Sequence, residues 1–532
     1  MDHSSGSCSC PTRWTTAKAA TRFAVADRSP LASLASAQLR RLGLASFFLV
    51  SLSLAGLSSG DLNGSSFFSA GSSGLTASAA AGEWPLFRGM NSTGRAVGAQ
   101  SLPAAIGPDA TPVWKTPLPP GHSSPAISGD RIFLTGVRDE RLVVLALDRS
   151  TGKSLWEVEV PHGKLESIHQ IGSHAQSSPA TDGERVVSFF GSSGLFCHDR
   201  DGKLLWRQAM GPFNNDFGAA SSPIIEGDFV ILCQDHDTGS FLMAVDKRTG
   251  KTLWRTDRSE FPRNFCTPVI WNNQGRRQIV VAATLRVVGY NLEDGQEAWT
   301  VRGISRTVCM TPALGEDNRL YIAGWAAGGD KDAPIRVAPF GEVLGMLDAN
   351  KNGTLEESEF ADGPIKQRFG QVDRDNNDRL DQAEYDYFRD LFERGRNVVL
   401  AINPGPNGEA TSTHVAWEHD RFVPFCASPL AYKGLVFTVK DGGIVSCLDA
   451  KTGKASKTGR LPNTNNYYAS PVAGDGKIYF LNQEGQLTVV SAEAEWKPIH
   501  TANFNEPTYA TPALLDGRVY LRTASALYCF GN

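Results

Sequence analysis

Short apolar runs separated by turn residues recur along most of this chain. The unit is Ser/Thr-Pro, an apolar run, a Gly- or Asp-containing turn and a second apolar run. Apolar runs of this length bounded by turn residues predict strands. Eight units begin at Ser124, Ser178, Ser222, Thr267, Thr311, Ser428, Ser470 and Thr511, with spacings of 54, 44, 45, 44, 117, 42 and 41 residues.

A second element follows the early units: an apolar strand, Asp, a turn with Gly-Lys, and then Leu-Trp. Its copies end at Trp156, Trp206 and Trp254, and a looser copy ends at Trp299. The Asp side chain can bond the turn backbone and the Gly supplies a positive φ, so each copy predicts a β-hairpin. Four short strands in about 44 residues are typical of one propeller blade.

The two ends of the repeat predict a closed ring. The unit that starts at Thr511 has room for three strands before the chain ends, and a fourth strand with its Trp stands at residues 112–117. We expect this segment, which includes Trp114, to complete the last blade and leave no open edge. The predicted fold is all-β, an eight-bladed propeller of four-stranded antiparallel blades.

The spacing of 117 residues indicates an insertion within the fifth blade, between propeller parts 82–336 and 397–532. Residues 337–396 contain two stretches with the spacing of a calcium loop. Oxygen-bearing residues occupy the ligand positions, as a hard cation requires. The predicted ligands are Asp348, Asn350, Asn352, Thr354 and Glu359 in the first loop, and Asp373, Asp375, Asn377, Arg379 (by its carbonyl) and Glu384 in the second.

The loops differ at their sixth position, where the first has Gly353 and the second Asp378. Gly accepts the sharp turn without strain, and Asp tolerates it better than most residues. Apolar flanking residues predict helices, so the insert is interpreted as a small all-α EF-hand pair. A permanent structural clamp and a calcium sensor are both open, and an exported protein, which meets steady calcium, favours the clamp.

The first 81 residues have no usable strand pattern. Arg40-Arg41 precede the apolar run Leu42–Leu57, which has the length of a signal-peptide core and is short for a membrane span. We predict a leader with a signal peptide and an exported, periplasmic or envelope-associated protein. Retention of this segment as an N-terminal anchor is the alternative, and the only predicted link to a membrane.

Composition narrows the function. The formal net charge is −4 with 20% charged residues, so nothing marks a nucleic-acid binder. Beyond Cys8 and Cys10 in the leader, seven cysteines are widely spaced, and we interpret them as small buried apolar residues. A Cys426–Cys447 disulfide stays open. We expect a monomer.

The likeliest place for a site follows from the parity of the connections. In a meander, the loop into the first strand and the loop from the second to the third lie on one face, so the insert shares the face of the loops before each Ser/Thr-Pro. Those loops are rich in His, Arg, Asn and Tyr, which suit a polar ligand. The candidate ligand-binding residues are His174, Asn215, Asp216, Arg263, Arg306, His419, Arg421 and Tyr467.

The Asp-x-x-Thr-Gly-Lys-x-Leu-Trp units resemble the PQQ-type propeller repeat, found in quinoprotein dehydrogenases and in an outer-membrane-assembly lipoprotein. The resemblance implies the fold and leaves activity open. We expect a binding or assembly module at the cell envelope, with calcium and a polar ligand or envelope protein as partners. A PQQ-dependent dehydrogenase is the alternative, although the sequence lacks the adjacent cysteine pair of the known dehydrogenases. A polysaccharide-active enzyme using Asp216 and Asp420 is a third.

Overall fold

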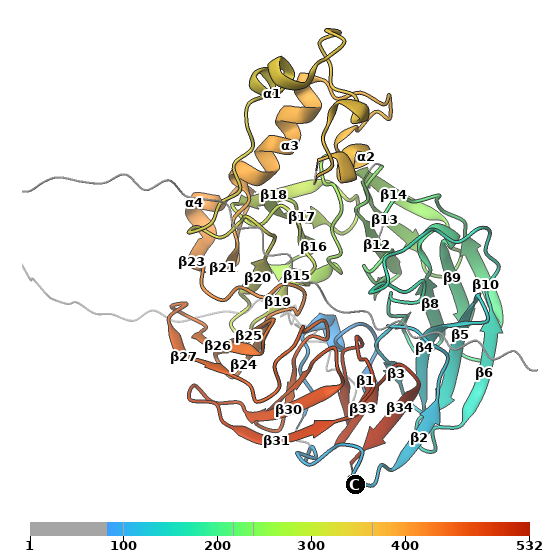
Figure 1. Ribbon diagram of the computed structural model, residues 1–532. Coiled ribbons are helices and arrows are strands. Elements are labelled where there is room, and N and C mark those ends of the chain that lie inside the picture. Colours follow the sequence, from blue (N-terminus) through green and yellow to red (C-terminus); the bar gives the residue numbers. More distant parts are fainter. Residues whose placement is uncertain (1–81, 99–100, 216, 238, 364, 532) are drawn as a thin grey trace, which may run out of the picture. The chain divides into compact units, whose positions relative to one another are not determined.

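The computed structural model describes residues 82–98, 101–215, 217–237, 239–363 and 365–531 (Figure 1). The predicted leader, residues 1–81, lies outside the described residues. Within them the chain forms eight sheets arranged around a ring, each built on four antiparallel strands as the repeat predicts. None of the helices in this part of the chain has the length and apolar character needed to cross a bilayer.

The first four blades follow the chain in order. They are β3 (Ala126–Ser128), β4 (Arg131–Arg138), β5 (Arg141–Asp148) and β6 (Ser154–Glu159); β7 (Ala180–Thr181), β8 (Arg185–Phe189), β9 (Leu195–Asp199) and β10 (Leu204–Gln208); β11 (Ile224–Glu226), β12 (Phe229–Gln234), β13 (Phe241–Asp246) and β14 (Thr252–Asp257); and β15 (Val269–Asn273), β16 (Arg276–Ala283), β17 (Arg286–Asn291) and β18 (Glu297–Arg302).

The remaining blades complete the ring. They are β19 (Ala313–Leu314), β20 (Leu320–Gly324), β21 (Val398–Ile402) and β23 (Val415–His419); β24 (Leu430–Tyr432), β25 (Leu435–Lys440), β26 (Ile444–Asp449) and β27 (Ala455–Arg460); β28 (Val472–Gly474), β29 (Lys477–Leu481), β30 (Gln486–Ser491) and β31 (Pro498–Asn503); and β32 (Ala513–Leu515), β33 (Arg518–Arg522), β34 (Ala526–Phe530) and β2 (Trp114–Pro117).

Strand β2 closes the ring from the other end of the chain. It pairs antiparallel with β34, with Trp114 opposite Cys529, so the predicted closing strand is confirmed. Two blades carry a fifth strand that the repeat does not predict. The strand β1 (Glu83–Trp84) pairs with β3, and β22 (Gly408–Glu409) pairs parallel with β18. The propeller part also contains the short helical turns η1 (Met90–Ser92), η2 (Gly191–Ser193) and α4 (Thr411–His414).

The Gly-Lys turns and the tryptophans of the repeat meet between blades. The Trp206 indole donates a hydrogen bond to the Lys247 carbonyl of the next blade, at 2.9 Å. Its ring lies against Gly250, where a Cβ atom would stand 2.6 Å from the indole. Trp114, Trp156, Trp254 and Trp417 make the same contact with the following turn. The turn therefore requires Gly both for its φ of +70° and to make room for the indole.

The Ser and Thr of the eight Ser/Thr-Pro pairs form a closed belt of hydrogen bonds near the ring axis. The backbone N–H of each donates to the hydroxyl of its equivalent in the next blade, and Thr511 donates to Ser124 to complete the circle. The donor–acceptor distances lie between 2.9 and 3.3 Å in the order 124, 178, 222, 267, 311, 428, 470, 511. A hydroxyl at this position, followed by Pro, is thus the feature that joins the inner strands.

The insertion leaves the fifth blade between β20 and β21, which is the predicted connection. This helical insert (residues 337–396) contains α1 (Phe340–Leu347), η3 (Glu357–Glu359), η4 (Lys366–Arg368), α2 (Phe369–Val372) and α3 (Gln382–Arg394). Leu355 and Leu380 join its two loops by a pair of backbone hydrogen bonds of 3.1 and 2.8 Å. A small apolar core lies around them, formed by Phe340, Val343, Leu355, Phe360, Phe369, Val372, Leu380 and Tyr385.

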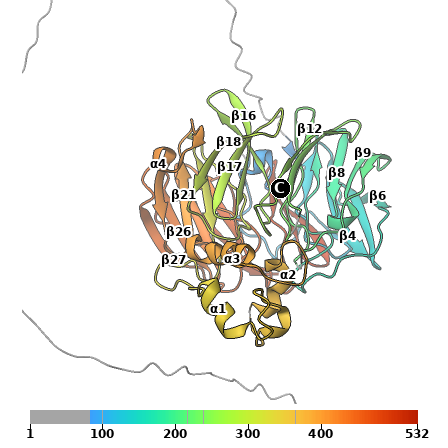
Figure 2. The same cartoon turned by 90° about the horizontal axis from the view of Figure 1, so that it is seen from above.

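The insert contacts the loop between β14 and β15, which leads into a Thr-Pro pair. Arg374 donates to the Ser259 carbonyl at 2.6 Å, and the Tyr387 hydroxyl donates to the Glu260 carbonyl at 3.0 Å. The insert therefore lies on the same face as the loops that lead into the Ser/Thr-Pro pairs, which we call the mouth loops. This agrees with the parity of the connections. Figures 1 and 2 show it standing out beside blades three to five and not across the centre of the ring.

Candidate functional site: the channel mouth and the insert

The residue two positions before each Ser/Thr-Pro forms a ring of eight just outside the belt: His122, Gln176, Ala220, Phe265, Cys309, Cys426, Tyr468 and Tyr509. Three aromatic members of this mouth ring contact one another. His122 stacks on Tyr509 with centroids 3.9 Å apart, and Tyr509 lies 5.4 Å from Tyr468. Burial lowers the pKa of His122 to about 3, so the imidazole is neutral in this stack.

A small, shallow pocket opens beside this stack, between blades eight and one. It is lined by His122, Tyr509 and the buried Arg522. The Arg522 guanidinium donates to the carbonyls of Ser123, Thr135 and Pro119 at 3.0–3.1 Å. Burial lowers the pKa of Arg522 to about 9. These hydrogen bonds join the first and last blades.

Two of the candidate ligand residues, Asn215 and Arg263, contact the same loop at Phe217. Asn215 accepts a hydrogen bond from the Phe217 N–H at 3.2 Å, and Arg263 lies over the Phe217 ring at 5.7 Å. Arg263 also pairs with Asp237, with Nε 2.9 Å from Oδ1. His174 is half-buried, and burial lowers its pKa. Asp216 lies outside the described residues.

The other candidate residues lie apart from this loop, each in its own surroundings. Arg306 lies 4.3 Å over the Phe392 ring of the insert and donates to the Ala327 carbonyl. Tyr467 is 1% exposed, and its hydroxyl donates to the Asn463 carbonyl at 2.7 Å. His419 is half-buried at the end of β23, and burial lowers its pKa. Arg421 is 73% exposed beside Asp332. The seven candidate residues that the structure describes are not gathered around one cavity.

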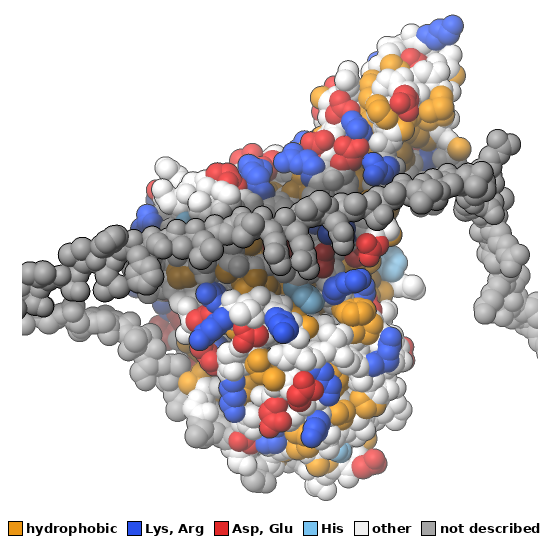
Figure 3. Space-filling view, turned by 90° about the vertical axis from the view of Figure 1, so that its left-hand side faces the viewer, with side chains coloured by type: hydrophobic (Ala, Val, Ile, Leu, Met, Phe, Trp, Pro, Cys, Tyr) orange, Lys and Arg blue, Asp and Glu red, His pale blue; other side chains and the backbone are white. Residues whose placement is uncertain are grey.

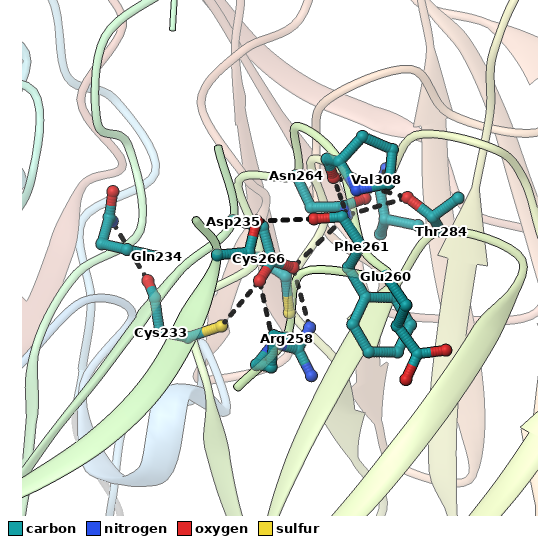
Figure 4. Close-up of polar contacts among 12 residues, drawn as sticks. Cys233, Gln234, Asp235, Arg258, Glu260, Phe261, Asn264, Cys266, Thr284 and Val308 are labelled. Carbon is teal, nitrogen blue, oxygen red and sulfur yellow. Dashed lines mark hydrogen bonds and ion pairs between the residues drawn. The ribbon is translucent and has the colours of Figure 1, made fainter. Parts of the chain in front are cut away.

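A buried ion pair that the sequence did not single out supports the insert from below (Figure 4). Arg258, 1% exposed, makes two hydrogen bonds to Asp235, of 2.8 and 2.7 Å. Asn264 donates to the same carboxylate at 3.3 Å and accepts from the Val308 N–H at 2.9 Å. Because Arg258 directly precedes the loop that holds the insert, this network fixes the surface on which the insert rests.

The second predicted calcium loop brings three carboxylates together. Ligand oxygens of Asp373, Asp375 and Glu384 lie within 4.8 Å of one another. Asp373 is buried and accepts from the Asn377 and Asp378 N–H groups at 3.1 and 2.9 Å. Asp378 has a φ of +61°, so an Asp adopts the left-handed turn that Gly usually provides. Oxygen atoms in a preformed loop suit a hard cation.

The first loop has the same backbone turn with fewer charges. Asp348 accepts from the Asn352 and Gly353 N–H groups at 3.1 and 3.0 Å, and Gly353 has a φ of +83°. Glu359 accepts from the Ala349 N–H at 2.8 Å. Hydrogen bonds to backbone N–H groups lower the pKa of Glu359. Neutral Asn350 stands where the second loop has Asp375.

Part of the chain is similar in sequence to a known protein family. The family described as outer membrane protein assembly factor BamB matches residues 96–210 and 143–307. The chain resembles the PQQ-type β-propeller repeat proteins. No curated protein sequence matches it.

Solved structures share the propeller. BamB from Moraxella catarrhalis superposes with a TM-score of 0.51 and 12% identity, covering 79% of this chain and 99% of that one. Quinohemoprotein alcohol dehydrogenase from Comamonas testosteroni gives a TM-score of 0.49 and 13% identity, covering 84% and 80%. At this identity the likeness to BamB concerns the fold alone.

Proposed function

We propose that this chain is a non-catalytic, calcium-binding propeller that docks a protein partner at the cell envelope, on the face that carries the helical insert. The predicted leader and the resemblance to an outer-membrane assembly factor support the envelope as its place of action. The observation that carries the proposal is an exposed aromatic residue held in a strained conformation at the base of the insert.

That residue is Phe422, which is 44% exposed and has a φ of +50°. A bulky side chain at positive φ is unfavourable, and such strain is commonly stored at functional sites. Its neighbour Arg421 reaches Asp332 in the chain leading to the insert, at 3.8 Å. Ile335, in the same lead, is 41% exposed, and Met346 of α1 is 72% exposed. Figure 3 shows apolar and charged side chains interspersed on the insert.

The proposed docking surface is formed by Asp332, Ile335, Arg421 and Phe422, which the Arg421–Asp332 pair links, with Met346 as a further exposed apolar group on the insert. It combines exposed apolar groups with both signs of charge. Aromatic anchors rimmed by polar groups are typical of protein-binding sites. Calcium in the two loops would fix the insert on which part of the surface lies. We expect a protein segment that offers an apolar side chain flanked by charged groups.

The mouth suits a small planar ligand less well than the docking surface suits a protein segment. Arg263 pairs with Asp237, Arg306 covers Phe392, and Arg522 binds three backbone carbonyls. An acidic quinone would have to compete for these cations and displace the His122–Tyr509 stack. The residues present at the mouth therefore do not fit a bound PQQ.

Site-specific photo-crosslinking in cells tests the docking surface. A crosslinking amino acid at Phe422 is expected to give one discrete protein adduct. The same amino acid at Leu155, which is 45% exposed on β6 of blade one, serves as the matched control and is expected to give none. Equal products from both positions, or none from Phe422, would contradict the proposal.

The dehydrogenase alternative has its own test. Purified protein mixed with PQQ and calcium is expected to reduce no dye with primary alcohols or aldose sugars. Dye reduction that depends on added PQQ would replace the binding module by the quinoprotein.

A further inference from the structure

Two cysteines that are 117 residues apart in the chain meet at the channel mouth. Cys309 and Cys426 occupy equivalent positions of the mouth ring in the adjacent blades five and six, each two residues before a Ser/Thr-Pro pair. The belt joins these blades at Thr311 N–H and Ser428 Oγ, 3.1 Å apart. The Cys309 side chain is close enough to Cys426 to raise the pKa of the Cys426 thiol. The side chains therefore point at each other from two backbones that are held in register.

These two residues differ from the other cysteines that the structure describes. Cys309 and Cys426 are half-buried, whereas Cys197, Cys233, Cys266, Cys447 and Cys529 are buried. Cys447, the partner considered for Cys426 from sequence, has its Sγ 3.9 Å from the Glu493 carbonyl instead. A partly exposed thiol can be reached by a thiol or disulfide reagent, and a buried one is inert.

We propose that Cys309 and Cys426 form a reversible disulfide that locks blades five and six together at the channel mouth. A disulfide requires facing Cβ atoms and Cα atoms about 4.4–6.8 Å apart, a spacing that adjacent positions of an inner ring can provide. This inference is independent of the docking function and would stand without it.

The oxidant is a disulfide, as a disulfide-exchange protein or oxidised glutathione. One cysteine, as its thiolate, attacks a sulfur of that disulfide, and a mixed disulfide forms as one thiolate leaves. The second cysteine, having lost its proton, attacks the protein sulfur of the mixed disulfide and expels the other thiolate. The two cysteines together lose two protons and two electrons, and the oxidant becomes two thiols.

Oxidation of the pair is expected to be slow at neutral pH, whether by oxygen or by disulfide exchange. The hydrogen bond to Cys309, together with burial, raises the pKa of Cys426 well above its ordinary value. The thiol form is therefore favoured, and the thiolate is the nucleophile in exchange. An exported protein would meet disulfide donors in its compartment.

The bridge would have a structural consequence for the insert. The loop that it closes runs from Cys309 to Cys426 and contains the whole of blade five and the helical insert. Cross-linking a loop of this length constrains the unfolded chain and stabilises the fold. The oxidised protein would therefore hold the base of the insert more firmly than the reduced protein.

Peptide mapping of the full chain tests the bridge. Protein purified with reductant is incubated with oxidised glutathione, alkylated and digested with trypsin. We expect a linked pair of peptides, 307–319 and 422–433, that disappears after reduction. The oxidised protein is expected to melt at a higher temperature than the reduced protein.

Two variants make the assignment specific. Cys309→Ser is expected to lose both the linked peptides and the shift in melting temperature, and Cys447→Ser to keep both. Recovery of both wild-type peptides in alkylated or glutathionylated form, with no link, would overturn the proposal, and mapping of the wild-type protein decides this even if a variant fails to fold. Linkage of either cysteine mainly to Cys266 would overturn it as well.

Discussion

The ring and the helical insert are stabilised in different ways. In the ring, each blade is tied to the next by the belt and, at five junctions, by an indole against a turn glycine. The insert has a core of eight buried apolar residues and touches the ring through few contacts, such as those of Arg374 and Tyr387. A small core of this kind needs an additional source of stability. We propose that bound calcium supplies it, so the ring should be stable without the ion and the insert should depend on it.

The largest expected effect is a loss of stability of the ring. Trp299 is fully buried, donates to Gln278 at 2.8 Å and packs over Gly289. Trp299→Ala is expected to lower the free energy of unfolding by about 3–5 kcal/mol, measured by urea denaturation. Calcium binding by the folded variant should be unchanged.

The matched control is Leu253→Ala, because Leu253 is 48% exposed on β14. Its cost should be within about 0.5 kcal/mol. A loss of calcium affinity in Trp299→Ala would show that the insert and the ring are not separate in stability.

Acid should weaken the ring before the insert core. Burial lowers the pKa of His122 to about 3 and of His198 and His236 to about 4, below the ordinary 6.5. The unfolded chain therefore binds more protons than the folded one below pH 6.5, and stability falls as the pH falls towards 4. The three histidines together should cost about 2–3 kcal/mol between pH 6.5 and 5.5.

Urea denaturation at these two pH values measures this loss. His198→Asn should make the dependence shallower, since one of the three groups is gone. Residues 337–396 contain no histidine, so the insert has no equivalent term. An unchanged slope in the variant would contradict the assignment.

The belt gives a smaller effect that should recur around the ring. Thr511→Val removes the hydroxyl that accepts from the Ser470 N–H at 3.0 Å and leaves that buried donor unsatisfied. A cost of about 2 kcal/mol is expected. Thr267→Val, at the equivalent position for the Ser222 N–H, should cost a similar amount in thermal or urea unfolding. A large cost at one site and none at the other would show that the belt is not a repeated device.

The smallest expected effect distinguishes the two calcium loops. Glu384→Gln removes one of three gathered carboxylates and should weaken calcium binding on the order of tenfold, about 1.4 kcal/mol, by isothermal titration calorimetry. Glu359→Gln, in the less charged loop, should have a smaller effect on the tighter of the two binding steps. The reverse order would indicate that Gly353, and not ligand charge, decides the stronger site.

The fold could be predicted from sequence because its signals are local and repeated. The Ser/Thr-Pro pairs and the Gly-Lys turns each lie within one unit, and a period of about 44 residues made the 117-residue gap visible. The closing strand with Trp114 could be predicted because the last unit has room for only three strands. The extra strands β1 and β22 were not predicted, since two residues carry no periodicity.

The site was less predictable because its contacts join loops that are far apart in the sequence. Arg263, Arg306 and Tyr467 were selected for their polarity, but polarity does not tell whether a side chain faces solvent or a neighbouring loop. Arg258 and Asp235 are 23 residues apart, and no pattern in the sequence joins them. Cys309 and Cys426 did carry a signal: both precede a Ser/Thr-Pro pair by two residues, so aligning the eight units places them side by side.

The most direct test of the account is amide hydrogen exchange on the full chain with and without calcium. Calcium is expected to slow exchange in residues 348–359 and 373–384 and in the contacting loop at Ser259 and Glu260, with no change in the strands of the other blades. Protection that spreads evenly through the ring, or none in either loop, would contradict a calcium-dependent insert on a calcium-independent propeller.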